Sequence, residues 1–112
     1  MSQLQDALKQ ITDPTVADAK AQFEQLIDDG KAASQAFIQS SAEQLEQWVI
    51  AVSKKEMDQD EFDELVSSQT IVAKNFVASQ AVEAQERAEK LTINALELAA
   101  TKIVPVLIAA AI

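Results

Sequence analysis

Residues 59–101 read QDEFDELVSSQTIVAKNFVASQAVEAQERAEKLTINALELAAT, and neither Gly nor Pro interrupts them. Along this stretch, apolar and small residues recur at steps of three and four, which is the spacing of one face of an α-helix. The recurring positions are Phe62, Val66, Thr70, Ala73, Val77, Ala81, Ala84, Ala88, Leu91, Ala95 and Leu98. The pattern predicts one long helix over residues 59–101, with many Ala residues that allow a close approach of another helix.

A polar break, KKEMDQD, precedes this helix at residues 54–60. Lys54 and Lys55 are typical of the last turn of a helix, where cations interact favourably with the helix dipole. Asp58 and Glu61 have the spacing of a capping box at a helix start. The break therefore predicts a short turn between two helices.

Upstream of the break, residues 14–54 show the same periodicity. Asp13 before Pro14 is typical of an N-cap followed by Pro at the first helical position. The apolar face then runs through Val16, Ala19, Phe23, Leu26, Gly30, Ala33, Phe37, Ser41, Leu45, Trp48 and Val52. Because the phase is kept across Asp28-Asp29-Gly30-Lys31, we expect one helix over 14–54, with Gly30 permitting close backbone approach. The alternative is a helix end at Gly30.

These elements predict an all-α fold in a single domain, 1–112. Two long helices joined by a short polar turn pack as an antiparallel hairpin if they meet within one chain. A short helix over residues 2–11 is expected before them, and an apolar helical tail over 103–112 after them. One Gly, two Pro and no Tyr in 112 residues are too few turn residues for a sheet protein.

The tail is the most unusual segment, because every residue from 103 to 112 is apolar. A helix that is apolar all round must be buried in protein or in lipid. Lys102 lies near the middle of the span 91–112, which disfavours a simple transmembrane anchor. Pro105 is expected to kink or end the helix near Thr101, so that the tail leaves the helix axis. The tail could be covered by self-assembly or the core, by a membrane, or by a separate partner.

A single hairpin has too little interior to bury all of the large apolar side chains, which favours oligomerisation. The residues expected at the self-association or membrane contact are Trp48, Phe62, Phe76, Ile103, Val104, Pro105, Val106, Leu107, Ile108 and Ile112.

The composition excludes most chemistries. The chain has no Cys and no His, which removes thiolate nucleophiles, zinc-thiolate sites and the commonest general base. The net charge of −9 and the scattered Lys and Arg residues argue against nucleic-acid binding. Acid pairs such as Glu43 and Glu46 are expected to be solvated helix faces. We therefore expect no enzyme activity, no cofactor and no metal.

Two functions remain. The first is a non-enzymatic, self-assembling structural protein whose long helices and apolar tail pack in a homo-oligomer, with a helical partner protein as a further possibility. The second is a membrane-active module, pore-forming or holin-like, that inserts the tail into lipid. The N-terminus lacks the basic start and apolar run of a signal peptide, so a cytoplasmic location is the default expectation. Membrane association and export by a signal-independent route are the alternatives.

Overall fold

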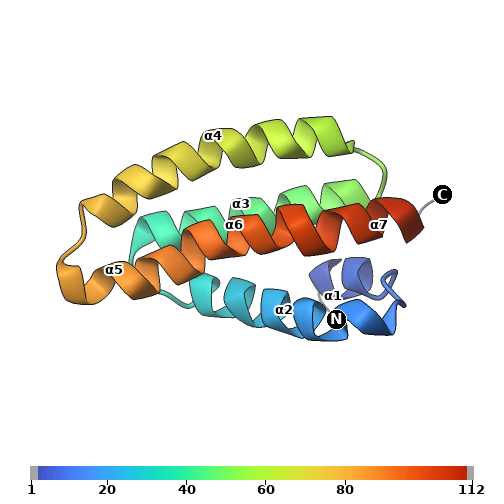
Figure 1. The fold of residues 1–112 in the computed structure, drawn as a ribbon, viewed down its shortest axis with the longest axis horizontal. Coiled ribbons are helices and arrows are strands. Elements are labelled where there is room, and N and C mark those ends of the chain that lie inside the picture. Colours follow the sequence, from blue (N-terminus) through green and yellow to red (C-terminus); the bar gives the residue numbers. More distant parts are fainter. Residues whose placement is uncertain (1–2, 111–112) are drawn as a thin grey trace.

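The computed structural model describes residues 3–110, and within that range all regular structure is helical (Figure 1). The all-α prediction is confirmed. The main elements are α2 (Ala17–Lys31), α3 (Ala36–Ser53), α4 (Gln59–Ala78) and a continuous helix over Val82–Ala110. The chain reverses direction between successive elements, so that helices adjacent in sequence are antiparallel (Figure 1). The short helix α1 (Gln3–Leu8) packs against α3 and α2.

The first predicted long helix, 14–54, is wrong in its continuity. It begins with the 3₁₀ turn η1 (Pro14–Val16), α2 ends at Lys31, and α3 begins only at Ala36. The chain folds back so that α2 and α3 face each other (Figure 1). Periodicity did not reveal this, because the loop of residues 32–35 leaves the spacing of three and four between apolar positions unbroken along the sequence.

Gly30 has both of the roles that the sequence suggested. The helix ends one residue later, and Gly30 is buried where α2 meets α3. A Cβ atom built on Gly30 would lie 2.7 Å from the Cβ of Ala42. A methyl group cannot fit at that distance, so the close approach of α2 to α3 depends on glycine.

The second predicted helix, 59–101, is divided as well. Helix α4 ends at Ala78, and the next helix begins at Val82 after an extended Ala81. The side chains of Ser79 and Gln80 both donate to the carbonyl of Phe76, at 2.6 and 3.3 Å. Such side-chain bonds to the backbone compete with helix continuation. They stabilise the turn that brings the last helix back over the core.

The last helix comprises α5 (Val82–Glu89), α6 (Ala95–Leu98) and α7 (Val104–Ala110), joined by the π-helical segments η2 (Lys90–Asn94) and η3 (Ala99–Ile103). The expectation that Pro105 ends or diverts the helix near Thr101 is wrong, because α7 continues along the line of α6 (Figure 1). The π segment η3 ends at Ile103, two residues before Pro105. Wider turns of this kind re-pair the backbone around a residue that breaks the α-helical pattern.

The predicted helix starts are confirmed. The Asp13 carboxylate accepts from the Thr15 N–H at 2.9 Å and from its hydroxyl at 2.8 Å, and these bonds lower the pKa of Asp13. Asp58 and Glu61 form the capping box of α4. The turn before it contains Lys55 with φ 62°, a left-handed conformation that costs a side-chain-bearing residue about 1–2 kcal/mol.

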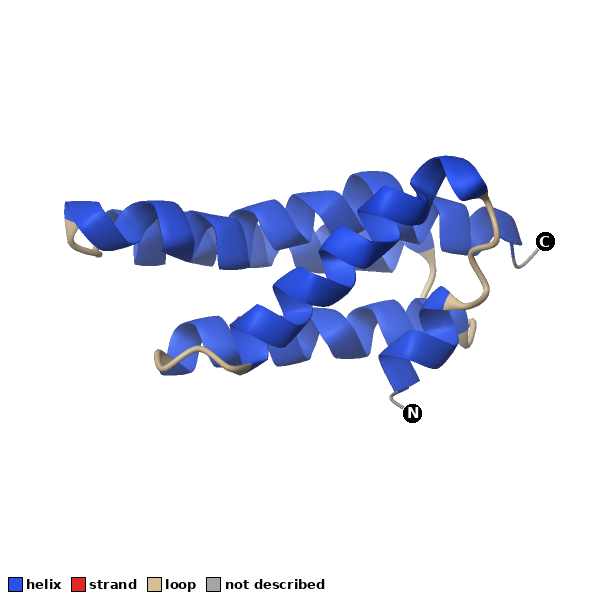
Figure 2. Cartoon of the chain, turned by 90° about the horizontal axis from the view of Figure 1, so that it is seen from below, coloured by secondary structure: helices blue, strands red, loops and turns tan. Residues whose placement is uncertain are grey.

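The helices enclose one core in an elongated molecule of 44 × 25 × 23 Å with a radius of gyration of 13.6 Å. That radius is close to the ~13 Å expected of a compact domain of this length. Figure 2 shows α2 crossing the other helices obliquely. The turns at residues 32–35 and 79–81 therefore convert the predicted long hairpin into a bundle with an interior of its own.

Candidate interaction surface

The apolar tail contributes to the core of the single chain. Ile103, Val104 and Leu107 are at most 1 % exposed, and α7 packs against α3 and α4. The remaining described residues of this predicted contact, Pro105, Val106 and Ile108, are half-buried. Ile112 lies outside the described residues. Much of the tail is thus covered without a membrane or a second chain.

The aromatic residues expected at the contact also pack within the chain. Phe62 is fully buried at the start of α4, whereas Trp48 is half-buried on α3. Phe76 is half-buried and stacks on Phe37, with ring centroids 4.4 Å apart. A bundle of four helical segments offers these rings the interior that a two-helix hairpin lacks.

A different set of apolar residues remains on the surface. Within the described part of the chain, the large apolar side chains that are well exposed are Leu65, Ile71, Val72 and Val82, at 36, 65, 48 and 82 %. Three of them are on α4, and Val82 follows the turn after it. Exposed apolar side chains therefore concentrate along one helix.

We call Leu65, Ser68, Ile71, Val72 and Asn75 the α4 outer face; all five are exposed uncharged residues that follow the acidic first turns of α4, and the exposed Glu64 borders them. The sequence contains a signal for this face that was missed. Residues 65, 68, 72 and 75 are separated by steps of three, four and three, which is a second helical stripe beside the buried one. The stripe is weak, since Ser and Asn alternate with the apolar residues.

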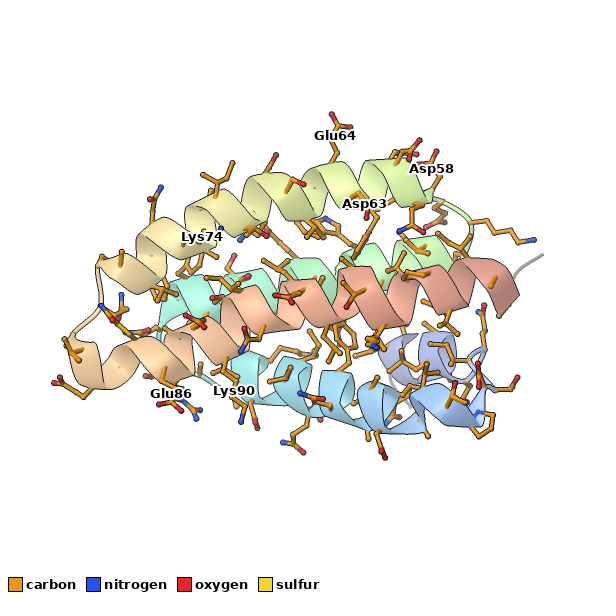
Figure 3. The ribbon with its side chains drawn as sticks, in the orientation of Figure 1. Asp58, Asp63, Glu64, Lys74, Glu86 and Lys90 are labelled. Carbon is orange, nitrogen blue, oxygen red and sulfur yellow. The ribbon has the colours of Figure 1, made fainter. Side chains whose placement is uncertain are left out.

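Charge is distributed unevenly along α4. Its first turns carry the exposed acids Asp58, Asp60, Glu61, Asp63 and Glu64. Residues 65–82 then contain no acid, which is the longest acid-free run of the chain, and Lys74 is their one charge. Figure 3 shows Glu64 projecting away from the bundle, at the edge between the acidic turns and the outer face. In a protein of net charge −9, this face is the part of α4 that a second acidic molecule could approach.

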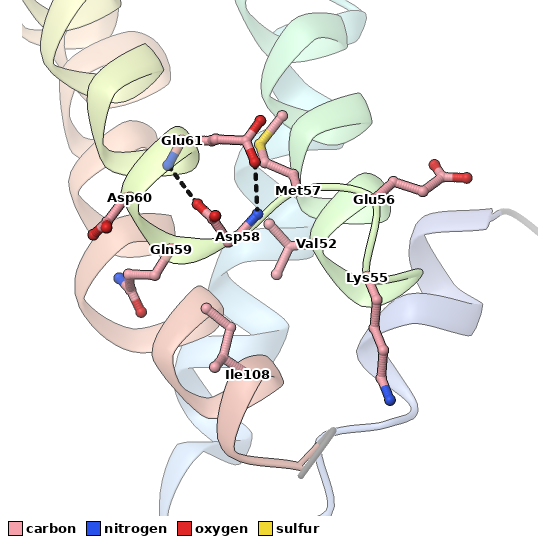
Figure 4. Close-up of a pocket in the computed structure, with 9 residues that line it drawn as sticks. All are labelled: Val52, Lys55, Glu56, Met57, Asp58, Gln59, Asp60, Glu61 and Ile108. Atoms are coloured by element: carbon pink, nitrogen blue, oxygen red, sulfur yellow. Dashed lines mark hydrogen bonds between the residues drawn. The ribbon is translucent and has the colours of Figure 1, made fainter.

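An open groove of about 590 Å³ lies where α3, α4 and α7 meet (Figure 4). Val52, Met57 and Ile108 are its apolar lining, and Lys55 and several acids form its polar part. Two of those acids serve the helix start: the Glu61 N–H donates to Asp58 Oδ1 at 2.8 Å, and the Asp58 N–H points to Glu61 Oε1 at 3.5 Å. The groove shows no pairing of a nucleophile with a base.

Acids elsewhere also have structural partners. Glu46 accepts from Lys31 with both carboxylate oxygens at 3.1 Å, which ties α3 to the end of α2. Among the described residues, no group of three or more His, Cys, Asp or Glu side chains could hold a metal ion. The polar groups therefore define helix ends and turns, and we identify no catalytic constellation in residues 3–110.

The helix over Val82–Ala110 is 29 residues long and, by length and composition, could cross a membrane. It is the one such helix in the part of the chain that is described. About a third of its most apolar stretch is buried in the bundle. The chain therefore contains a helix compatible with membrane association, although the core helix of a soluble bundle has the same properties.

Comparison of the chain with protein-family models, with curated proteins and with solved structures gives no match.

Proposed function

We propose that this protein is a non-enzymatic, self-associating structural protein whose copies meet through the α4 outer face. The observation that supports this function is the concentration of exposed Leu65, Ile71 and Val72 on one helix. Apolar side chains grouped on a helix face are stabilised by packing against another helix. The proposal differs from the expectation drawn from the sequence in its location, since the tail residues contribute to the core of each copy.

Light scattering after size exclusion, in plain buffer over a range of concentrations, tests this function. We expect wild-type protein to associate reversibly and the Ile71→Glu variant to stay monomeric, because a carboxylate would be desolvated at the centre of the contact. Val82→Glu is the matched control, since it also places an acid at an exposed apolar position but lies off the face. A wild-type chain that remains monomeric at the highest concentration refutes the proposal.

Truncation of the tail is a poor test of self-assembly. A chain ending at Thr101 would lose Ile103, Val104 and Leu107 from the core, and burial of each contributes about 1.5–3 kcal/mol. Such a chain would unfold whether or not copies associate. Substitutions on α4 change the surface and leave the core intact.

A membrane-active module, pore-forming or holin-like, is the second candidate, and the bilayer-length helix over Val82–Ala110 supports it. In that case the bundle must open so that this helix leaves α3 and α4 for lipid. Vesicles of neutral lipid loaded with dye provide the test, because the net charge of −9 disfavours anionic surfaces. Failure of the intact protein to release dye from any lipid composition eliminates this candidate.

The proposed partner is thus a second copy of the chain, with lipid as the partner in the second candidate. A cytoplasmic location, the default expectation from the N-terminal sequence, agrees with the first function. Membrane association agrees with the second.

A further inference from the structure

We infer that residues 67–87 form a lid that opens from the bundle as one body while the other helices stay packed. These residues are the second part of α4, the turn after it and the start of α5, and we call them the α4–α5 hairpin. The inference concerns a single chain and does not rest on the proposed self-association. The turn of the hairpin lies at one end of the molecule, farther out than the loop that joins α2 to α3 (Figures 1 and 2).

The α4–α5 hairpin contributes little to the core. Within residues 67–87, Ala73 and Val77 are the buried residues, and Val77 keeps 9 % exposure. None of the largest fully buried side chains of the described chain belongs to the hairpin. Residues 88–107, a stretch of similar length, contain nine buried residues, among them Leu96 and Ile103. A segment with few buried apolar contacts opens at a lower free energy than the core around it.

Open hollows flank α5 on two sides. One of about 550 Å³ lies between α5 and residues 32–38. Another of about 490 Å³ lies between the end of α4 and the last helix, and it is lined by Lys74, Val77, Ala78, Gln85, Glu89 and Ile93. The side chains of α5 therefore meet water at places where a tightly packed helix would meet another helix.

Two contacts hold the tip of the hairpin, and both come from the start of α3. The rings of Phe37 and Phe76 stack with their centroids 4.4 Å apart, and Gln35 Nε2 donates to Gln80 Oε1 at 2.8 Å. We call these two contacts the clasp. Gln35 is exposed and the other three side chains are half-buried. Because water reaches all four residues, the clasp exchanges its contacts for hydration more readily than a buried pair does.

Further bonds lie inside the hairpin and keep its turn intact. Gln80 Nε2 donates to the Phe76 carbonyl at 3.3 Å, and Gln85 Nε2 donates to the Gln80 carbonyl at 3.2 Å. These bonds remain when the clasp separates, so the two arms move together. Along the α4 arm, the bond from Gln69 Nε2 to Ser41 Oγ on α3 is long, at 3.4 Å.

The rest of the bundle keeps its interior when the hairpin opens, because α2, α3 and the helix beyond Ala88 contact one another directly. Opening separates α4 from the first turns of the helix over Val82–Ala110. The hairpin is thus a lid over the start of that helix. Its opening is the first step by which the helix would leave the bundle in the second candidate function.

Hydrogen exchange followed by mass spectrometry tests the lid on the intact chain. The protein is kept at a concentration where light scattering shows monomers, so that contacts between copies do not protect α4. After correction for intrinsic rates, we expect peptides within residues 67–87 to exchange at least about tenfold faster than peptides within 38–52 and 91–107. One common rate in all of these peptides means that the bundle opens only as a whole, and it overturns the inference.

Truncation of the clasp tests which contact holds the lid. Phe37→Ala lies outside the hairpin and acts on it through the stack with Phe76. We expect exchange within residues 67–87 to become about tenfold faster and that within 91–107 to stay unchanged. Ile71→Ala is the matched control, since it shortens a side chain of the hairpin that is 65 % exposed, and it should leave both rates unchanged. Equal acceleration of both regions by Phe37→Ala overturns the inference.

A covalent clasp tests the converse, and the chain is suited to it because it has no cysteine. The double variant Gln35→Cys with Gln80→Cys is bridged by a short bismaleimide. The same variant with each thiol capped by N-ethylmaleimide is the control. Bridging should slow exchange within residues 67–87 at least about tenfold relative to the control, towards the rate of residues 91–107. An unchanged rate overturns the inference, because the hairpin would then exchange without opening at the clasp.

Discussion

Moving one methyl group between α2 and α3 tests the close approach of these two helices at Gly30. The Gly30→Ala variant places a Cβ atom 2.7 Å from the Cβ of Ala42, well inside van der Waals contact. Gly30 does not have a positive φ, so the backbone itself accepts alanine. Two effects then oppose each other. Helix propensity favours alanine by about 0.8–1.0 kcal/mol, and overpacking of a dense core costs about 1–3 kcal/mol.

We expect Gly30→Ala to lower the free energy of unfolding by roughly 1 kcal/mol net. The double variant Gly30→Ala with Ala42→Gly is the decisive one. It removes the Cβ atom with which the methyl group added at position 30 would clash, and it leaves the number of helical glycines unchanged. Ala42→Gly alone should lower the free energy of unfolding by about 1 kcal/mol, because glycine has a lower helix propensity than alanine. The double variant should therefore be more stable than the sum of the single effects by about 1–3 kcal/mol, the cost of the removed clash.

Urea unfolding followed by circular dichroism gives the four free energies of this cycle, and the fluorescence of the single Trp48, half-buried on α3, provides an independent probe. Coincident transitions from the two probes would justify a two-state treatment. Additive effects, with no coupling between positions 30 and 42, would refute the close approach of α2 and α3. They would also favour the unbroken helix over residues 14–54.

Three further outcomes follow from individual side chains. Lys55→Gly should raise the free energy of unfolding by about 1 kcal/mol, because glycine adopts the left-handed conformation without strain. Lys55→Ala retains the strain and is the control in the same urea titration. Ile103→Ala should lower the free energy of unfolding, measured by chemical denaturation, by about 2–5 kcal/mol, as expected of a core side chain. A decrease below about 1 kcal/mol would mean that the tail is not packed in the monomer. The pKa of Asp13 is lowered in the folded chain, so its stabilising effect is complete above the ordinary value of 3.8 and is lost as the pH falls through the lowered pKa. Asp13→Asn, which retains a hydrogen-bond acceptor, should abolish that part of the pH dependence of the free energy of unfolding, measured by urea titrations at several pH values. An NMR titration of the Asp13 carboxyl resonance in the wild-type protein checks the lowered pKa itself.

The helix starts were predictable because their signals are local. Asp13 before Pro14, and Asp58 three residues before Glu61, each satisfy backbone N–H groups within one turn, so the interaction that fixes the boundary is contained in the pattern. The turn after Ser53 follows in the same way, whereas the short helix expected over residues 2–11 ends at Leu8. These boundaries require no knowledge of what the helices pack against.

The turns at residues 32–35 and 79–81 depend on long-range gains, and the sequence offered the first of them only as the alternative of a helix end at Gly30. Residues 32–35 and 79–81 contain no Pro, and continuing the helix through them would cost little locally. Folding back is favoured because it lets the stripes of four segments share one core, which two extended helices cannot do within one chain. The candidate surface was missed for a related reason: α4 has apolar residues on two faces, and only the packing decides which face is buried.

The order of the residues is enough to conclude that the chain is helical, that it has no Cys or His chemistry, and that a tail apolar on every side must be buried. Helix propensity, capping and composition are properties of neighbouring residues, so they can be read along the chain. The packing of the bundle sets where the long helices turn. It also buries Ile103, Val104 and Leu107 under the chain's own helices and leaves Leu65, Ile71 and Val72 exposed. Those choices are set by how much apolar surface the whole bundle can bury at once, a sum over contacts that are distant in sequence.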